Sequence, residues 1–250
     1  MGQIRTLVVI PTYNEKYSLP QIAQQVLQLR DNIGLLVVDD ASPDGTGQVA
    51  DDLSRKHPER MWVLHRAVKN GLGSAYLDGF RWGLSHLNGI EYFVQMDADG
   101  SHDPAAVLSL EQAAASADLV IGSRYLNGIR ILDWPMRRLL LSYISNMVTR
   151  LASGLPLTDC TSGFKCFRRA TVEKVLTKKI DAMSYDFQVE VNTYCLWSGL
   201  KIVEVPITFH NRLKGDSKLT RTDVIRAALM VCTLGFRRLL PHSLRLPNQS

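Results

Sequence analysis

The chain has 250 residues, of which 46% are hydrophobic and 21% charged, as expected for a globular protein with a sizeable core. Its four cysteines show neither Cys-x-x-Cys nor His-rich spacing, a pattern that argues against a cysteine metal site and is typical of free thiols in a reducing cytoplasm. Residues 1–5 lead directly into an apolar run and lack the pattern of a secretory signal peptide.

Charge is distributed unevenly along the chain, whose net charge is +5. Through Ser123 there are 9 Lys and Arg against 15 Asp and Glu, whereas from Arg124 onward there are 20 against 9. An acidic first part suits a bound cation, and a basic second part suits an anion. Charge alone leaves nucleic acid, a phosphorylated substrate and a membrane surface open as that anion.

The first half of the chain alternates between two kinds of apolar pattern. Short continuous runs predict buried strands, and the segments between them have helical spacing. This alternation predicts an α/β protein with a mostly parallel sheet and right-handed crossovers. Because the first, second and fourth strands end in acids or turn residues, one edge of the sheet should bind a nucleotide. The predicted strands are 6–10, 34–38, 61–65 and 92–94, and the predicted helices are 19–29, a helix ending near 56, and 75–87.

The second half continues with a strand that ends in a Gly-Ser-Arg-Tyr turn, and its later helices carry basic residues. The last predicted strand is interrupted by Pro206. No apolar stretch reaches the roughly 20 residues that a membrane-spanning helix needs. The predicted elements are a strand at 119–125, a helix at 131–151, a loop into a short strand at 159–167, a helix at 187–197, a strand at 201–209 and a helix at 221–240.

Two carboxylates, Asp97 and Asp99, follow the fourth strand with one residue between them. Alternate residues of an extended chain point the same way, so both can lie on one side of the strand end. Such close charges are costly unless a cation neutralises them, and Mg²⁺ is commonly held by carboxylates together with substrate phosphates. An isolated Asp-x-Asp is more often a solvated turn, so this prediction depends on the surrounding motifs.

Four motifs follow predicted strand ends, at residues 11–15, 39–46, 97–99 and 122–125. In this combination the chain resembles family 2 glycosyltransferases with the GT-A nucleotide-sugar fold, and among them the dolichyl-phosphate (polyprenyl-phosphate) mannosyltransferases. The resemblance covers nearly all of residues 4–220. Further matching segments lie at 69–76, 161–165, 187–190 and 204–209, the last followed by Arg212, Gly215, Ser217 and Lys218.

The resemblance implies a nucleotide-sugar site in the first half of the chain. Its base and ribose pocket would be formed by Pro11, Tyr13, Glu15, Val38 and Asp40, with Asp40 bonded to the base edge. The diphosphate would be held by Asp97, Ala98 and Asp99 through Mg²⁺ or Mn²⁺, with Asp97 and Asp99 as metal ligands. Family members often have Gln or Ser two residues beyond the second Asp, where this chain has Ser101.

Cations should carry the chemistry, because a lipid phosphate acceptor is already ionised at neutral pH and needs little base catalysis. Arg suits this role through its bidentate fork. The resemblance implies an acceptor-phosphate site of Arg124, Arg138 and Ser142, with Trp134 nearby, and a donor-closing loop with Arg212 and Lys218. The predicted catalytic residues are Arg124, Asp99 and Arg138. The alternative for each cation is an ordinary solvated surface residue.

Two further residues near these motifs have no assigned role. His102 follows Asp97–Asp99, the segment called the metal motif below, but a single loop histidine is more often structural or exposed than catalytic. Glu190 is a candidate for orienting the donor or the metal.

Two basic helical segments bear on membrane contact. Residues 227–236 carry no charge and lie between Arg226 and Arg237, and Leu139–Leu141 follow Arg138. Both are too short to span, and they suit either the membrane interface or an ordinary core or dimer contact. A polyprenyl acceptor favours peripheral contact on the cytoplasmic face. Relatives often carry C-terminal transmembrane helices, and their absence here leaves room for a separate anchoring subunit.

The sequence therefore predicts a GT-A domain over residues 1–220 and a C-terminal amphipathic helix and tail over 221–250, without a transmembrane span. The predicted activity is metal-dependent, inverting transfer of mannose from GDP-mannose to a polyprenyl phosphate. One alternative is transfer of glucose or N-acetylglucosamine from a UDP-sugar to a lipid phosphate or polysaccharide. Another is a non-catalytic nucleotide-binding module. A nucleic-acid partner is not expected, since the nucleotide edge is acidic and a basic-aromatic stacking surface is absent.

Overall fold

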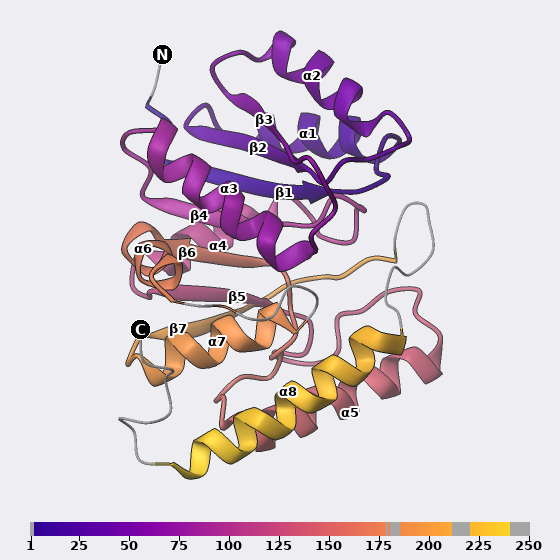
Figure 1. Ribbon diagram of the computed structural model, residues 1–250, viewed down its shortest axis with the longest axis vertical. Coiled ribbons are helices and arrows are strands. Elements are labelled where there is room, and N and C mark those ends of the chain that lie inside the picture. The colour runs from indigo at the N-terminus through magenta and orange to yellow at the C-terminus, as the bar shows by residue number, and fades with distance from the viewer. Residues whose placement is uncertain (1–2, 179, 181–185, 212–220, 241–250) are drawn as a thin grey trace.

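The computed structural model describes residues 3–178, 180, 186–211 and 221–240, and within them a seven-stranded sheet of order β3-β2-β1-β4-β6-β5-β7 (Figure 1). All neighbouring strands are parallel except β6, which runs antiparallel to both β4 and β5. The prediction of a mostly parallel α/β sheet is confirmed. The strands are β1 Thr6–Thr12, β2 Ile33–Asp39, β3 Met61–His65, β4 Tyr92–Gln95, β5 Leu119–Ser123, β6 Lys165–Arg168 and β7 Ile202–Pro206.

Helices cover both faces of the sheet because successive strand residues point to opposite sides. Leu7 and Val9 of β1 pack on one face with side chains of α3, α6 and α7, whereas Val8 and Ile10 pack on the other with α1, α2 and α4. The bounds are α1 Leu19–Leu27, α2 Thr46–Lys56, α3 Leu72–His86, α4 Ala106–Ala114, α5 Met136–Ser153, α6 Arg169–Leu176, α7 Phe187–Trp197 and α8 Arg221–Leu239.

Several predicted boundaries were wrong, and two helices were missed. The helix predicted from residue 131 begins at Met136, because Pro135 is extended (φ −57°, ψ 140°) and Ile131 instead forms a β-bridge with Phe209. The helix predicted from residue 75 begins at Leu72. Helices α4 and α6 were not predicted. Strand β7 ends on Pro206, which an edge strand tolerates because the missing N–H is not needed by a further strand.

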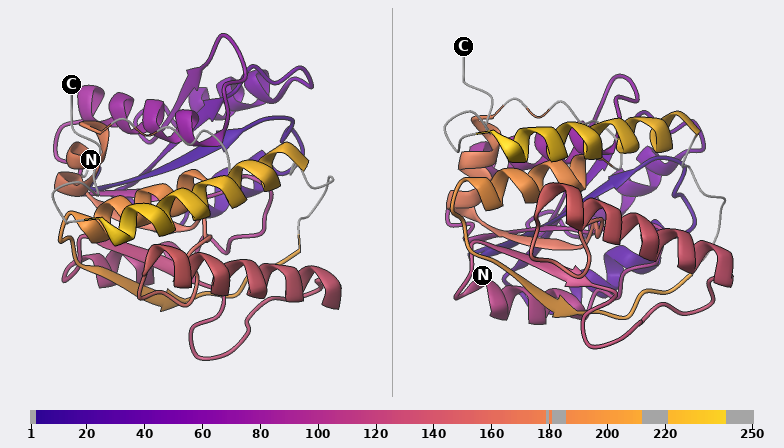
Figure 2. Two further views of the ribbon diagram at one scale, coloured as in Figure 1. Left: turned by 60° about the horizontal axis from the view of Figure 1, so that its bottom comes forward. Right: turned by 90° about the horizontal axis from the view of Figure 1, so that it is seen from below.

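Helices α5 and α8 lie side by side, apart from the sheet (Figure 2). They are joined by contacts such as Arg238 Nη1 to the carbonyl oxygen of Leu151 at 2.7 Å. The outer surface of α5 is unusually apolar; its exposed large side chains are Met136, Leu140, Leu141, Tyr143, Ile144, Met147, Val148 and Leu151. Over the described residues, none of the helices is both long enough and apolar enough to cross a membrane.

Candidate active site at the carboxyl edge of the sheet

The end of β2 carries two buried carboxylates with different partners. Asp39 accepts a hydrogen bond from Thr12 Oγ1 at 3.0 Å and so ties the ends of β1 and β2 together. Asp40 accepts from Arg66 Nη1 at 2.9 Å and from the backbone N–H of Asn70 at 3.3 Å. Burial raises the pKa of Asp40 above its ordinary value, against the opposing charge of Arg66. Asp40 is therefore a fixed acceptor at the edge where a base was predicted.

The other predicted pocket residues lie around this point. Pro11 and Val38 are direct partners in the register of β1 and β2, although the Val38 side chain is fully buried and packs in the core. Tyr13 is half-buried, and Lys69 Nζ lies 3.8 Å from its ring centroid. The backbone N–H of Glu15 donates to a threonine hydroxyl at the start of α2. These residues meet at the ends of adjacent strands, as a nucleotide pocket at this edge requires.

The metal motif follows β4 on the same edge. Asp97 is half-buried and accepts a hydrogen bond from the Tyr76 hydroxyl at 3.2 Å. Asp99 is 7% exposed and accepts from the backbone N–H of Ser101 at 3.0 Å, while Ala98 between them is buried. Burial, with the nearby Asp97 charge, raises the pKa of Tyr76 well above its ordinary value, so the phenol stays a hydrogen-bond donor. The two carboxylates are thus oriented before any ligand arrives.

His102 supports this motif from inside the protein. Its Nδ1 accepts the backbone N–H of Asp97 at 3.1 Å, and its ring stacks on Phe164 at 4.7 Å. Burial lowers its pKa, which keeps the ring neutral and Nδ1 available as an acceptor. His102 is therefore a structural residue here, as expected of a single loop histidine.

The oxygen donors at this motif fit a hard divalent cation. The described residues contain no group of three or more His, Cys, Asp or Glu that could enclose a metal by themselves. Mg²⁺ and Mn²⁺ do not need such a cage, because substrate phosphates complete their coordination. The hydroxyl of Ser101 is fully buried beside Asp99 and has no hydrogen-bond partner in the described chain. Asp97, Asp99 and Ser101 are therefore the residues that would hold the ion.

Arg124 follows β5 and is held by a buried carboxylate that was not predicted. Its Nε and Nη2 donate to Asp159 at 2.6 and 2.8 Å, and Nη2 also donates to Thr161 Oγ1 at 2.8 Å. Burial alone would raise the pKa of Asp159, but the Arg124 charge and hydrogen bonds outweigh it and hold that pKa below its ordinary value. Within the described chain, Nη1 of Arg124 has no hydrogen-bond acceptor. The fork is therefore fixed on one side and leaves Nη1 for a ligand.

The two other predicted acceptor residues lie on α5 or at its start. Arg138 is half-buried, with its guanidinium 3.9 Å from the ring centroid of Trp134. Ser142 Oγ accepts the hydroxyl of Tyr125 at 2.8 Å, which links α5 to the residue after Arg124. Both predicted residues thus come to the β5 side of the edge.

Three predicted residues, Arg212, Lys218 and Glu190, have not yet been described. Arg212 and Lys218 lie outside the described residues. Glu190 is half-buried in the first turn of α7. Residues that the sequence reasoning missed include Arg66, Tyr76 and Asp159. A signal existed for two of them, because Tyr76 ends one matching segment and Asp159 lies two residues before another.

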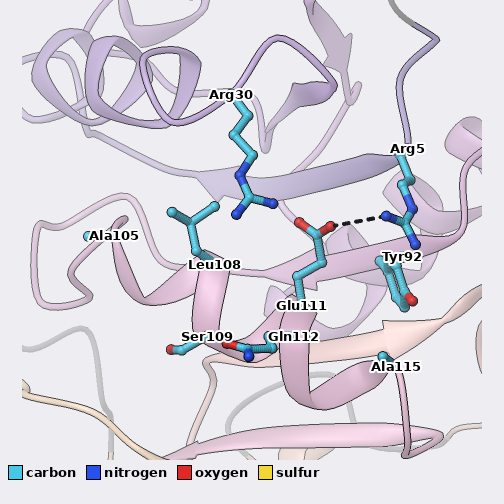
Figure 3. Close-up of a pocket in the computed structure, with 9 residues that line it drawn as sticks. All are labelled: Arg5, Arg30, Tyr92, Ala105, Leu108, Ser109, Glu111, Gln112 and Ala115. Carbon is cyan, nitrogen blue, oxygen red and sulfur yellow. Dashed lines mark ion pairs between the residues drawn. The ribbon is translucent and has the colours of Figure 1, made fainter.

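A separate cavity of about 580 Å³ lies at the opposite edge of the sheet, beside Arg5 just before β1 (Figure 3). Arg30 and Glu111 point toward each other across it, and Arg5 pairs with Glu111 at 4.0 Å. None of the predicted site residues lines it. The candidate site is therefore defined by the residues gathered at the strand ends, not by this cavity.

Solved structures with the same architecture show which fold this protein has. Glucosyl-3-phosphoglycerate synthase from Mycobacterium tuberculosis, in complex with Mn²⁺, UDP and glucosyl-3-phosphoglycerate, aligns with a TM-score of 0.64 over 98% of this chain and 81% of its own, at 17% identity. The mannosyltransferase PcManGT from Pyrobaculum calidifontis, in complex with GDP-Man and Mn²⁺, aligns with a TM-score of 0.56 over 94% and 74%, at 16% identity. The protein has the GT-A glycosyltransferase fold.

The chain belongs to glycosyl transferase family 2, whose model matches residues 7–176. It is 44% identical over 234 residues to a polyprenol monophosphomannose synthase of Mycolicibacterium smegmatis, covering 93% of this chain and 88% of that protein. It is 43% identical over 232 residues to an undecaprenyl-phosphate mannosyltransferase of Micrococcus luteus, covering 93% and 94%. The predicted family is confirmed, and the protein is a glycosyltransferase.

Proposed function

We propose that this glycosyltransferase transfers mannose from GDP-mannose to a polyprenyl phosphate, with inversion at the sugar, and that it uses Mg²⁺ or Mn²⁺. The observation that carries the proposal is the placement of two carboxylates after β4 and two arginines after β5 on one edge of the sheet. The names of the two relatives support the mannosyl donor and the polyprenyl phosphate acceptor. The Mn²⁺ ions in the two solved structures support a divalent cofactor.

The residues divide the work between donor and acceptor. Tyr13 and Asp40 bind the base, and Asp97 and Asp99 orient the donor diphosphate. Asp97 and Asp99 would hold the divalent cation, which would supply positive charge to stabilise the departing diphosphate. A direct attack by the already ionised acceptor phosphate on the sugar gives inversion and needs no general base.

In this proposal the acceptor phosphate binds to the guanidinium of Arg124, whose position is fixed by Asp159. Arg124 is held by Asp159, so its Nη1 is presented without the cost of ordering a flexible side chain. Arg138, stacked on Trp134, supplies a second guanidinium, and Ser142 a hydroxyl. We place Arg212 and Lys218 on the donor side by the family resemblance.

The exposed apolar surface of α5 suggests how a polyprenyl chain reaches this site. Eight large apolar side chains face outward along one helix whose first turn contains Arg137 and Arg138. Such a helix suits the membrane interface, with apolar side chains among the lipid tails and arginines at the head groups. We propose peripheral contact through α5 and α8 on the cytoplasmic face, with residues 1–220 as the catalytic domain and 221–250 as an added membrane-contacting segment. A separate anchoring subunit is compatible with this arrangement.

A UDP-sugar donor is the second candidate, and the UDP bound to the M. tuberculosis structure favours considering it. Guanine presents two adjacent donors to a carboxylate, whereas uracil presents one donor between two acceptors. The fixed Asp40 carboxylate suits guanine better, so GDP-mannose is the preferred donor.

Asp99→Asn tests the metal assignment with little change in side-chain volume. We expect it to lower metal-dependent mannosyl transfer from GDP-mannose to a polyprenyl phosphate by at least about 100-fold, because one anionic ligand is lost. Circular dichroism and melting temperature should be nearly unchanged. Asp103→Asn, in the exposed turn that follows, is the matched control and should keep full activity. Full activity in Asp99→Asn would refute the metal role.

A further inference from the structure

Three segments that carry the proposed chemistry meet at one aromatic side chain, that of Phe209. The first segment contains the metal motif after β4, the second contains Arg124 after β5, and the third contains Trp134 and Arg138 at the start of α5. Phe209 itself lies three residues beyond β7, in the segment at 204–209 to which the proposed function gives no role.

Backbone hydrogen bonds fasten this residue to two of the segments. The N–H of Phe209 donates to the carbonyl oxygen of Arg130 at 2.8 Å, and its own carbonyl accepts the N–H of Leu132 at 2.9 Å. On the other side, the N–H of His210 donates to the carbonyl oxygen of Ser101 at 3.1 Å. Phe209 therefore forms β-bridges to both the donor side and the acceptor side of the site.

The ring of Phe209 makes the same connection through side chains. It packs edge-to-face against His102 at 5.5 Å and against Trp134 at 5.4 Å, and the guanidinium carbon of Arg124 lies 5.4 Å from its centroid. His102 in turn accepts a hydrogen bond from the backbone N–H of Asp97, and the guanidinium of Arg138 lies over the ring of Trp134. A continuous set of packed rings thus joins the backbone of Asp97, a proposed metal ligand, to Arg124 and Arg138, the proposed acceptor arginines.

We propose that Phe209 is a positioning residue that sets the separation between the metal-bound donor and the acceptor arginines. This inference rests on the proposed function. Edge-to-face rings have few alternative arrangements at full density, so they hold their neighbours at fixed distances. A displacement of about 1 Å between reacting groups can cost about 100-fold in rate. Phe209 contacts the residues that hold the reacting groups, and its effect should appear in turnover more than in donor affinity.

Phe209→Leu removes the ring contacts and keeps an apolar side chain. We expect kcat for mannosyl transfer to fall by about 10- to 100-fold, while the Kd for GDP with Mg²⁺, measured by calorimetry, changes by less than about threefold. Phe209→Tyr keeps the ring and should restore kcat to within about threefold of the wild type. Equal losses in kcat and GDP affinity, or a failure of Tyr to restore activity, would overturn the positioning role.

Phe80→Leu is the matched control. Phe80, a buried residue of α3, also makes two edge-to-face ring contacts at 5.5 Å, with Phe93 and Phe167. Its ring lies 6.4 Å from that of Tyr76, farther than either ring contact of Phe209. It should lower the melting temperature and leave kcat per folded molecule unchanged. If Phe80→Leu and Phe209→Leu reduce kcat equally, the effect of Phe209 is only structural.

A second readout separates this proposal from the proposed function. The indole N–H resonance of Trp134, assigned with Trp134→Phe, should shift when GDP and Mg²⁺ bind to the wild type, because Phe209 connects the two sides. In Phe209→Leu that shift should largely disappear. If the wild type transfers no mannose but the Trp134 response depends on Phe209, the function fails and the positioning role stands. A Trp134 response that is equal in both proteins, or absent in the wild type, overturns the positioning role.

Discussion

At the scale of single residues, the buried pair of Arg124 and Asp159 changes how the central arginine is understood. The sequence motif around Arg124 predicts an unpaired cation that binds a phosphate. In the structure, one side of its guanidinium already forms an ion pair with Asp159. Removing such a cation leaves a buried, unpaired carboxylate, which is costly. Loss of activity in an Arg124 variant would therefore combine loss of stability with loss of chemistry.

Arg124→Met should lower the free energy of unfolding by about 3–5 kcal/mol, measured by urea denaturation at pH 7. The double variant Arg124→Met/Asp159→Asn should lose less than the sum of the two single variants, because the uncompensated charge is removed together with its partner. Arg169→Met, which breaks the exposed pair with Glu173, is the control and should cost at most about 1 kcal/mol. A loss of similar size in the two single arginine variants would contradict the buried ion pair.

Lys165 is a second buried cation, and its proton makes stability depend on pH. Its Nζ donates to the carbonyl oxygen of Gln188 at 2.9 Å. Burial lowers its pKa from 10.5 to about 7, although the nearby Cys195, Asp159 and Cys160 favour the charged form. Between about pH 7 and 10.5 the unfolded chain keeps a proton that the folded chain has released. Stability from this group therefore rises with pH in that window and is flat below it.

Wild type and Lys165→Met should show this difference in urea unfolding at pH 6.5, 7.5 and 8.5. The stability of the wild type relative to the variant should rise with a slope approaching about 1.4 kcal/mol per pH unit above pH 7. Lys56→Met, at the exposed end of α2, is the control and should show no such slope. A pH-independent difference between wild type and Lys165→Met would refute a neutral buried lysine.

At the scale of elements, the strand pattern was the most predictable part of the sequence. The core strands β1 and β2 are continuous apolar runs buried on both faces, so their sequence signal is strong. The start of α5 was less predictable, because a β-bridge from Ile131 to a distant segment overrides local helical spacing. The position of Asp97 and Asp99 just after β4 could be predicted from the apolar run of that strand. Asp159 and Phe209 could not be placed, since their partners are long-range contacts that no local pattern encodes.

Helix α5 is the element whose proposed role is most directly testable. Leu141 is 69% exposed, so Leu141→Glu should leave stability unchanged and weaken binding to phosphatidylglycerol vesicles by about tenfold or more, since one buried leucine contributes about 1.5–3 kcal/mol. Co-sedimentation at low and high salt measures this. Val68→Glu changes an equally exposed apolar residue in the loop after β3 and serves as the control. If the wild type fails to bind vesicles at low salt, α5 has another role, such as a dimer contact.

At the scale of the whole molecule, the uneven charge of the sequence follows the order of functional segments. The acidic part through Ser123 contains β1 to β5 with Asp97 and Asp99, for which we propose donor binding, and the basic part begins with Arg124 and includes α5 and α8. In the proposed function, the acidic part binds the divalent cation and the basic part binds the acceptor phosphate.

Donor selectivity should be visible in the stability of the whole protein. A donor present at 100 times its Kd stabilises the folded state by about 2.7 kcal/mol, which raises the melting temperature of a chain of this size by roughly 5–10 °C. With Mg²⁺ present, GDP-mannose should give this shift, and UDP-glucose and UDP-N-acetylglucosamine at equal concentration should give less. A larger shift with either UDP-sugar would favour the alternative donor.

The antiparallel strand β6 also acts as a spacer. It lies between β4 and β5, so the strand that delivers Asp97 and the strand that delivers Arg124 are two positions apart. Neighbouring strands are about 4.8 Å apart, so the two backbones leave the sheet about 10 Å from each other. That width accommodates a sugar between two phosphate groups, whereas adjacent strands would force the phosphates together. In the proposed function, β6 therefore sets the coarse distance between the strand ends that carry the donor and acceptor residues, and Phe209 adjusts the positions of their side chains.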